Sequence, residues 1–409
     1  MGVGGSGGPP VGLYVHVPFC VSICPYCDFV VYAGSVARGP RARIDAFVDA
    51  LEVELDLRAD ALDRRYGRGR SPLESLYLGG GTPSLVAEDA IGRIIGLVRE
   101  RYGMIEDAEI TLEANPGPDE RGDPAAWVRA GVTRLSFGAQ SFDDMQLRRL
   151  GRRHRSSHVA EAVAEARAAG VPSVSLDLLY DVPEQSVFGW MTTLDAALDL
   201  EPDHLSLYDL TLDDLDAEGL TGPDGDHRSA MPGARRWRDI ARPLQDEDHA
   251  AAQYHHAVFR LAEAGYRGYE ISNWAKPGHE SRHNRIYWER RPYEAVGPGA
   301  HAFDGRIRRW NAANLERYIG ALTPANGGRG RLPPGGTEEL DAATAATERM
   351  ILGLRLDTGI PFADTQAPPV ADTFIWALTA ELVDVTPDDR VVLTTRGRLL
   401  SNELFARLV

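Results

Sequence analysis

Short apolar runs alternate with longer, helix-like stretches through the first half of the chain. The apolar runs predict buried strands, and the stretches in which apolar residues recur every three or four positions predict amphipathic helices. This alternation is typical of repeated βα units and therefore of an α/β fold around a parallel sheet. The expected strands are Gly12–Val17, Leu73–Leu78, Glu109–Glu113, Arg134–Gly138, Ser173–Leu179 and His204–Tyr208.

The segments between these strands carry the spacing of helices that pack on such a sheet. The apolar positions after the first two strands are Ile44, Phe47, Val48, Leu51 and Leu55, and Ile91, Ile94, Ile95 and Val98. A closed barrel of this type has eight βα units. Because six are visible in this sequence, we expect a partial (β/α)6 TIM-like barrel that stays open.

The pattern divides the chain into four sections. Residues 1–10 predict a Gly- and Pro-rich flexible tail, and residues 11–212 hold the barrel. Residues 213–325 predict an α+β extension, which opens with a charged, Pro-rich stretch without sustained period up to about Asp248. A Gly/Pro linker then leads to residues 337–409, where a helix around Thr344–Leu354 and the run RVVLTTRGRLLSNELF predict a small winged-helix-like module.

Composition narrows the range of functions. The chain has 409 residues, of which 43% are hydrophobic and 25% charged, which is typical of about two or three globular domains. A net charge of -16 disfavours nucleic acid as a partner, so we expect the C-terminal module to be structural. No apolar run approaches the roughly 20 residues of a membrane-spanning helix, and the first residues lack a signal peptide. We therefore expect no integral membrane segment and a cytoplasmic location.

The candidate chemistry begins with the cysteines. Cys20, Cys24 and Cys27 lie within eight residues directly after the first strand and are too few for a disulfide framework. A loop of this length can place three thiolates around one face of a cubane iron-sulfur cluster and leave the fourth iron without a protein ligand. The alternative is a zinc site that adds His16 to the three cysteines. Structural zinc sites usually draw ligand pairs from two separate segments, so the single loop favours the cluster.

Polar or glycine-rich motifs accompany the next four strands. They are GGGTP at residues 79–83, EANP at 113–116, SFGAQ at 136–140, and Asp177 in the fifth strand. The carboxyl ends of barrel strands converge on one mouth, where glycines let a ligand approach the backbone. Acidic and amide groups there accept hydrogen bonds from an ammonium group or from ribose hydroxyls. Each motif taken alone also fits an ordinary strand-end cap.

The C-x3-C-x2-C spacing after a first barrel strand resembles the radical S-adenosylmethionine superfamily. The segments YVHVPFC, CPYCDF, LGGGTPS, LEANP, RLSFGAQSF, LGRRH and LDLLYDVPEQ further resemble its branch of oxygen-independent coproporphyrinogen III dehydrogenases and HemW-like heme chaperones. The resemblance implies a [4Fe-4S] cluster on Cys20, Cys24 and Cys27, with S-adenosylmethionine chelating the open iron. It implies that this cofactor is held by Tyr14, Tyr26, Gly80, Gly81, Thr82, Glu113, Gln140, Arg152 and Asp177.

Two features separate the relatives within that branch. The dehydrogenases carry a fourth cysteine two residues after the third, where this chain has Phe29. The chaperones carry an HNxxYW motif, which matches His283, Tyr287 and Trp288 here. A neutral imidazole is a good axial ligand for heme iron, and flat Tyr and Trp side chains stack on a porphyrin. The alternative is that His283 is a core residue whose ring is held by hydrogen bonds.

The resemblance thus implies a heme chaperone that binds heme and delivers it to heme-accepting proteins, with an electron donor such as flavodoxin or ferredoxin. The alternative within the branch is an enzyme that decarboxylates the propionates of coproporphyrinogen III by radical chemistry. Four further histidines receive no role from the sequence. They are His301 in the motif GPGAH, and His249, His255 and His256 on a predicted helix.

Overall fold

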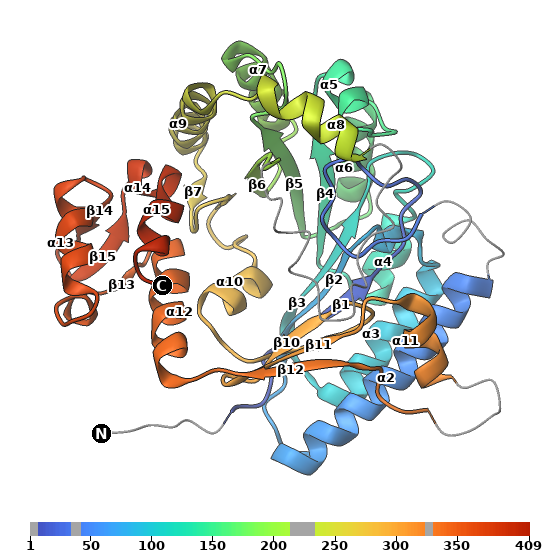
Figure 1. Ribbon diagram of the computed structural model, residues 1–409. Coiled ribbons are helices and arrows are strands. Elements are labelled where there is room, and N and C mark those ends of the chain that lie inside the picture. Colours follow the sequence, from blue (N-terminus) through green and yellow to red (C-terminus); the bar gives the residue numbers. More distant parts are fainter. Residues whose placement is uncertain (1–6, 34–41, 213–233, 324–329) are drawn as a thin grey trace.

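The computed structural model describes residues 7–33, 42–212, 234–323 and 330–409 (Figure 1). Its centre is a curved sheet in which six parallel strands lie side by side in sequence order. They are β1 (Gly12–Val17), β2 (Leu73–Gly80), β3 (Met104–Ala114), β4 (Arg134–Gln140), β5 (Ser173–Tyr180) and β6 (His204–Asp209). All six predicted strands are confirmed, and only β3 begins away from the expected residue, at Met104 instead of Glu109.

Helices cover the outer face of these strands. They are α2 (Ala42–Tyr66), α3 (Glu88–Tyr102), α4 (Pro124–Ala130), α5 (Asp144–Arg149), α6 (Ser156–Ala168) and α7 (Val187–Leu198), with a short 3-10 helix η1 (Pro83–Leu85). Strand residues such as Leu76 and Leu112 are fully buried against helix residues such as Leu51 and Ile94, as the helical spacing predicts. This apolar layer is the main core of the molecule.

The inner face of the sheet is different, because it is largely polar. Glu113, Ser136, Asp177 and Ser206 alternate with the apolar positions of β3 to β6 and line a cavity. A closed barrel usually fills its interior with branched apolar side chains. A polar interior therefore marks a space that is built to hold a ligand.

The predicted extension, together with the end of the linker that follows it, lengthens the sheet at both edges. β9 (Tyr293–Val296) pairs parallel with β1, and β10 (His301–Phe303), β11 (Ile307–Asn311) and β12 (Gly335–Glu339) follow it antiparallel. At the other edge β8 (Asn273–Ala275) and β7 (Arg267–Gly268) add to β6. The barrel stays open as predicted, with β12 and β7 as its edge strands. These strands of two to five residues are too short to show a period of two in the sequence.

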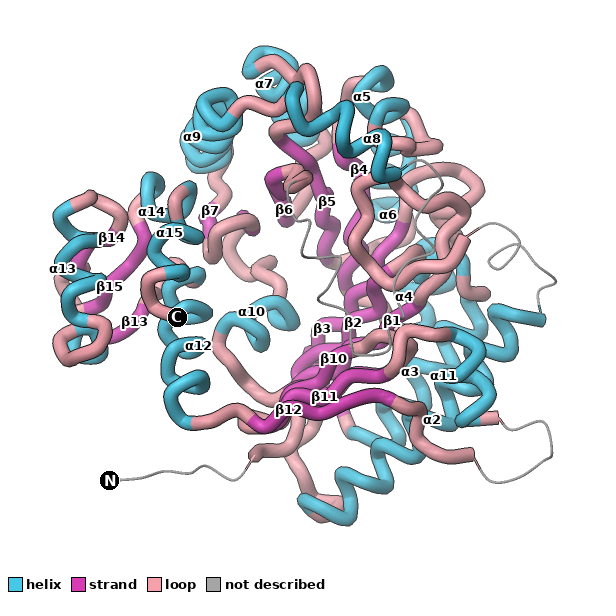
Figure 2. The backbone as a smooth tube through the Cα atoms, in the orientation of Figure 1, coloured by secondary structure: helices cyan, strands magenta, loops and turns pink. Residues whose placement is uncertain are grey.

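The helices of the extension lie on both faces of the sheet. They are α8 (Ala234–Ala241), η2 (Arg242–Leu244), α9 (Glu247–Glu263), α10 (Arg282–Trp288) and α11 (Leu315–Leu322). Of these, α9 and α11 join the outer layer beside α7 and α2. Figure 2 shows α10 within the curve of the sheet. The expectation of no regular structure up to Asp248 is wrong for α8, because Trp237 and Ala241 pack on Leu150 and Leu179 of the barrel. Residues 213–233 of that stretch lie outside the described residues.

The last section has its own small core around Leu354, Phe374, Val391 and Leu404. It contains α12 (Ala342–Arg355), β13 (Ile360–Pro361), η3 (Phe362–Thr365), α13 (Ala371–Thr379), β14 (Val383–Val385), β15 (Arg390–Leu393), α14 (Thr395–Leu399) and α15 (Ser401–Ala406). The three strands pair antiparallel in the order β13-β15-β14. The helix predicted around Thr344–Leu354 and the strand followed by helix are confirmed.

Two segments that the sequence predicted to be a flexible tail and a linker are partly held in place by hydrogen bonds. The backbone N–H of Gly8 donates to the carbonyl of Asp304 at 2.8 Å, so the second half of the predicted tail is fixed to the extension, while residues 1–6 lie outside the described part of the chain. The end of the predicted Gly/Pro linker belongs to β12, since Gly335 pairs with Asn311. Among the described residues no helix is long and apolar enough to cross a bilayer.

Candidate cluster and cofactor site

The cysteine loop leaves the carboxyl end of β1 and is closed at its base. Phe19 is fully buried, and the backbone N–H of Cys20 donates to the carbonyl of Tyr32 at 3.0 Å. Inside the loop the N–H of Cys27 donates to the carbonyl of Cys24 at 3.1 Å, which forms a turn. Arg238 of α8 covers the loop by donating to the Pro25 carbonyl at 3.1 Å and to the Asp28 carboxylate at 2.7 Å. These bonds hold the three thiols on one side of the loop.

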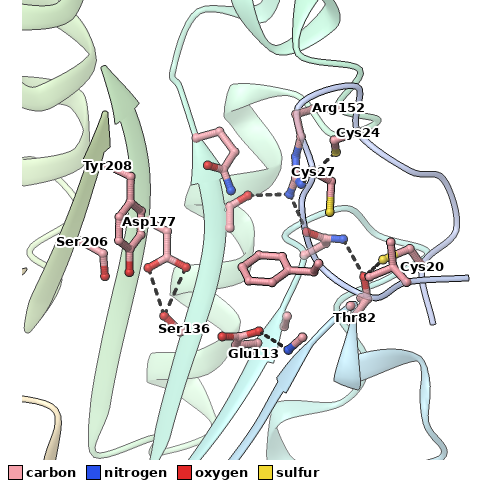
Figure 3. Close-up of a pocket in the computed structure, with 18 of the residues that line it drawn as sticks. Cys20, Cys24, Cys27, Thr82, Glu113, Ser136, Arg152, Asp177, Ser206 and Tyr208 are labelled. Carbon is pink, nitrogen blue, oxygen red and sulfur yellow. Dashed lines mark hydrogen bonds between the residues drawn. The ribbon is translucent and has the colours of Figure 1, made fainter. Parts of the chain in front are cut away.

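The thiols face a cavity of about 410 Å³ at the mouth of the barrel (Figure 3). Its walls come from the cysteine loop, from β2 to β6 and from α10. The structure thus brings together most of the residues that the resemblance implied. The predicted residues that line this cavity are Cys20, Cys24, Cys27, Tyr26, Gly80, Gly81, Thr82, Glu113, Gln140, Arg152 and Asp177.

A chain of hydrogen bonds connects two of the sulfur atoms. The Thr82 hydroxyl donates to Cys20 Sγ at 3.6 Å, and Arg152 Nη1 donates to Cys24 Sγ at 3.6 Å. Asn115 joins the two donors, because its Nδ2 donates to Thr82 Oγ1 at 3.1 Å while its Oδ1 accepts from Arg152 (Figure 3). Donors directed at sulfur stabilise the thiolate over the thiol, which is what a metal ligand requires.

The thiol environment fits an iron-sulfur cluster. Burial raises the pKa of Cys20 to about 12 and that of Cys27 to about 11, so the free thiols keep their protons near neutral pH. Cluster binding replaces those protons, because only thiolates ligate metals. Within the described ranges no three His, Cys, Asp or Glu side chains converge on one point as a single-ion site requires. A cubane needs no such convergence, since each thiolate binds a different iron.

The alternative zinc site is not assembled in this structure. His16 Nε2 donates to the Val30 carbonyl at 2.7 Å, and Nδ1 accepts from the Tyr14 hydroxyl at 3.0 Å. With both ring nitrogens used, His16 offers no fourth ligand to the cysteines. The same bond keeps Tyr14 out of the cluster cavity, which separates it from the other residues expected to hold S-adenosylmethionine.

Glu113 is the central acidic group of the cavity. Its carboxylate accepts from the Tyr77 hydroxyl at 2.7 Å and from the backbone N–H of Gly80 at 2.9 Å. Burial raises its pKa to about 7, and the nearby charge of Asp177 adds to this. Gly80 has φ +107°, and a Cβ there would lie 2.4 Å from the His16 ring, so this position requires glycine.

The adjoining wall holds the groups suited to a ribose. The Ser136 hydroxyl donates to Asp177 at 3.2 Å, and burial raises the pKa of Asp177. Gln140, at the end of β4, has φ +65°. A non-glycine residue in this region is strained, and such strain is often found where a side chain is directed at a ligand.

The cavity also contains residues that the sequence analysis did not assign. Among them are Tyr77, Arg134, Ser206, Tyr208 and Asn284. Arg134, Ser206 and Tyr208 each lie an even number of residues from an assigned group or from another inward residue of the same strand. The period of two in β4 and β6 was therefore the signal that could have found these three.

The HNxxYW motif forms α10 and is anchored from the barrel. Glu109 of β3 accepts from the N–H groups of Arg282 at 2.9 Å and His283 at 3.1 Å, which caps the helix. His283 is fully buried, with Nδ1 hydrogen-bonded to Ser75 Oγ at 2.8 Å and Nε2 to the Tyr287 hydroxyl at 2.8 Å. In this conformation neither nitrogen is open to an iron atom. His283 reaches a ligand only if Tyr287 moves away.

Tyr287 and Trp288 line a second cavity, of about 600 Å³. Tyr14 and Phe29 line it as well, and Phe29 also borders the cluster cavity. The two cavities are therefore adjacent at the end of the cysteine loop. His249, His255 and His256 lie on α9, as predicted, and line neither of these cavities.

The fold and the cysteine site define a radical S-adenosylmethionine protein, and the family model described as "Radical SAM superfamily" matches residues 14–195. A curated relative from Mycobacterium tuberculosis, "Heme chaperone HemW", is 36% identical over 402 residues, which cover 98% of this chain and 95% of the relative. The protein of the same name from Escherichia coli is 37% identical over 307 residues, or 74% of this chain and 73% of the relative. The chain therefore belongs to the HemW family.

Two further comparisons extend this result. "Radical S-adenosyl methionine domain-containing protein 1, mitochondrial" from Bos taurus is 34% identical over 416 residues, covering 98% of this chain and 86% of the relative. Coproporphyrinogen III oxidase (HemN) from Escherichia coli superposes with a TM-score of 0.77 at 22% identity, covering 98% of this chain and 90% of that chain. At this identity the superposition confirms the fold and carries no statement about activity.

Proposed function

We propose that this protein is a heme chaperone that holds a [4Fe-4S] cluster and S-adenosylmethionine in one cavity and heme in the neighbouring one. It delivers the heme to acceptor proteins, and a flavodoxin or ferredoxin supplies electrons to the cluster. The observation that carries the proposal is the pair of adjacent cavities, one lined by three cysteines and one by the aromatic residues of α10. Family membership supports the assignment, since the curated relatives bear the name heme chaperone.

In the first cavity we assign Cys20, Cys24 and Cys27 to the cluster. When bound, such a cluster leaves one iron open for S-adenosylmethionine and supplies the electron that cleaves it. Thr82 and Arg152 donate hydrogen bonds to the cysteine sulfurs and stabilise their negative charge.

The remaining cavity residues are assigned to S-adenosylmethionine. The Glu113 carboxylate holds its amino group, and Gly80 and Gly81 let its methionine part approach the backbone. Gln140 and Asp177 accept from the ribose hydroxyls. Tyr26, partly buried in the cysteine loop beside Cys24, lines the same cavity.

In the second cavity we assign Tyr287 and Trp288 to contacts with the porphyrin. Their rings supply flat apolar area, which is the main source of affinity for such a ligand. His283 lies directly behind Tyr287 and holds its hydroxyl. Its imidazole reaches heme iron only when that bond opens.

The proposal is tested by loading the protein with both cofactors. Anaerobic reconstitution with iron and sulfide should give one four-iron cluster whose EPR spectrum changes on addition of S-adenosylmethionine. Addition of heme should give a Soret band, and mixing with apomyoglobin should move the heme to that acceptor. A protein that takes up zinc and no cluster, or that shows no saturable heme binding, would contradict the proposal.

A direct assay distinguishes the proposed heme chaperone from the alternative, a coproporphyrinogen III dehydrogenase. Phe29 stands where that branch carries a fourth cysteine, and its side chain is 68% exposed at the rim of both cavities. We expect no decarboxylated product from coproporphyrinogen III with S-adenosylmethionine and a reductant. Steady product formation would show that the protein acts as the dehydrogenase and would contradict the proposed chaperone function.

A further inference from the structure

The second cavity has a definite set of walls. The C-terminal end of α10 supplies Tyr287 and Trp288, while Tyr293 of β9 and Phe303 of β10 contribute two more aromatic rings. α12 and the loop segment at Asp28 to Val30 complete it. Asp28 is already paired with Arg238, so its charge is compensated. The cavity is therefore dominated by flat aromatic surfaces, as a large planar ligand requires.

His301 is the only histidine besides His16 that lines this cavity among the described residues. Its side chain is exposed and stacks on Trp310, with ring centroids 5.9 Å apart and an angle of 22° between the planes. In the described part of the chain its ring makes no hydrogen bond. By contrast, His16 and His283 both have two hydrogen-bonded ring nitrogens. His301 is thus the one imidazole of this cavity with free nitrogen atoms.

The GPGAH motif explains how His301 reaches this position. Gly297 has φ +102° and Gly299 has φ +75°, so both need glycine. A Cβ on Gly297 would lie 2.4 Å from the His16 carbonyl oxygen, and one on Gly299 would lie 2.8 Å from the Val30 side chain. The two glycines therefore let the turn pack closely against the cysteine loop. His301 follows directly at the start of β10.

Although one side of the His301 ring is open to solvent, its partial desolvation in the cavity and the neighbouring Arg309 and Arg308 lower its pKa. The imidazole is consequently neutral near pH 7 and has a lone pair for a metal.

Arg290 provides an unused donor in the same wall. Its side chain is 8% exposed, and its Nε and Nη1 bind Glu348 at 3.2 Å and the Gly305 carbonyl at 3.3 Å. Its Nη2 is buried without a hydrogen-bond partner in the described ranges, and the same holds for Nε1 of Trp288. Buried donors without partners are rare in folded proteins and call for a ligand or a water molecule. An anionic group in the cavity would satisfy them.

We propose that this cavity binds heme with His301 as an axial ligand of the iron and Arg290 as the partner of a propionate group. The inference rests on the proposed heme binding and adds the position and the ligands. The aromatic walls match the porphyrin ring, the free imidazole matches the iron, and the unpaired guanidinium nitrogen matches the carboxylate. His283 remains the core residue that orients Tyr287.

The experiment is a heme titration of the cluster-loaded protein, followed by the Soret band. His301→Ala should shift the Soret maximum and weaken heme binding at least tenfold, and added imidazole should restore the parent spectrum. The control is His255→Ala, which removes an exposed histidine of α9 and should change nothing. Binding of iron-free protoporphyrin IX, followed by its fluorescence, should be equal in both variants, because it has no iron to ligate.

A second comparison tests the propionate. Arg290→Gln should weaken heme binding several-fold but leave the binding of heme dimethyl ester unchanged. If a His301→Ala protein with full cluster content keeps the parent Soret maximum and affinity, the inference is wrong while the proposed function stands. If the parent protein itself binds no heme, the proposed function fails.

Discussion

The two cavities are built in different ways, although both are bordered by Asp28 and Phe29 of the cysteine loop. The cluster cavity takes its residues from the carboxyl ends of consecutive strands, so each functional group follows a recognisable apolar run. The second cavity combines Tyr14, His16 and the end of the cysteine loop with residues of α10, β9, β10, β11 and α12, which are distant from the first strand in sequence. A site of the first kind can be found from local motifs. A site of the second kind depends on how the sheet is completed, which no local motif encodes.

The two cavities also differ in the charged side chains that line them. Glu113 and Asp177 form a pair of carboxyl groups in the cluster cavity, which Arg134 and Arg152 also line, and burial raises the pKa of both carboxyl groups. In the second cavity Arg290 and Arg308 both pair with Glu348, while Asp28 of the same cavity pairs with Arg238. A pair of carboxyl groups suits the cationic S-adenosylmethionine, and a pair of arginines suits the propionates of heme. The proposed function therefore assigns the cationic cofactor to the cavity with the carboxyl pair and the anionic heme to the cavity with the arginine pair.

The largest effect should follow from removing a cluster ligand. Cys24→Ser should abolish the four-iron cluster, because two thiolates do not hold it, but should leave heme binding within about twofold. Iron and sulfide analysis measures the first quantity and heme titration the second. The matched control is Ser22→Ala, which lies in the same loop and carries no thiol. Loss of heme binding together with the cluster would show that the cavities are not independent.

The second effect concerns the core role of His283. His283→Ala removes two buried hydrogen bonds and leaves Ser75 and Tyr287 without their partner. We expect the free energy of unfolding to fall by about 2–4 kcal/mol, measured by urea unfolding. Tyr287→Phe removes one of those bonds and should cost about 1 kcal/mol. If His283→Ala is as stable as the parent but loses the Soret band, His283 is an open heme ligand and the two histidines exchange roles.

The sequence predicted most of the cluster cavity because the barrel strands are long and buried. Tyr14 was the exception, since a strand position does not reveal that its hydroxyl binds His16. Arg134 was missed although it begins a predicted strand, because a lone arginine usually marks a solvated surface.

The second cavity was predictable only in part. Tyr287 and Trp288 were found through their motif, but His301 had no assigned role because the strand that carries it has three residues. Long-range pairing of β9 with β1 places these residues together, and pairing of that kind leaves no periodic signal.

The third effect tests the charge of Glu113 in the cluster cavity. In the proposed assignment Glu113 holds the amino group of S-adenosylmethionine as a carboxylate, and its pKa in the free protein is raised to about 7. The affinity for S-adenosylmethionine should therefore be constant above pH 7 and fall by up to about tenfold for each pH unit below it. The EPR change of the reduced cluster measures this. Glu113→Gln should weaken binding at pH 8 and remove the step near pH 7. A step that survives in Glu113→Gln would assign the titration to another group, with Asp177 the nearest candidate.

The smallest effect comes from the aromatic wall of the second cavity. Trp288→Phe reduces the aromatic area of the wall and removes the unpaired Nε1 donor, but it keeps a flat ring. That ring can still contact the guanidinium of Arg355, which lies 4.2 Å from the Trp288 ring. Since stacking of this kind contributes about 0.5–1.5 kcal/mol, heme affinity should fall about two- to tenfold while the Soret maximum stays in place. Trp376→Phe, which alters a similar pair of tryptophan and arginine in the C-terminal section, is the matched control and should leave heme affinity unchanged. A shift of the Soret maximum in Trp288→Phe would mean that this side chain positions the iron ligand as well as the porphyrin. A loss of heme affinity in both variants would mean that the substitutions act by destabilising the protein and not by removing a contact with heme.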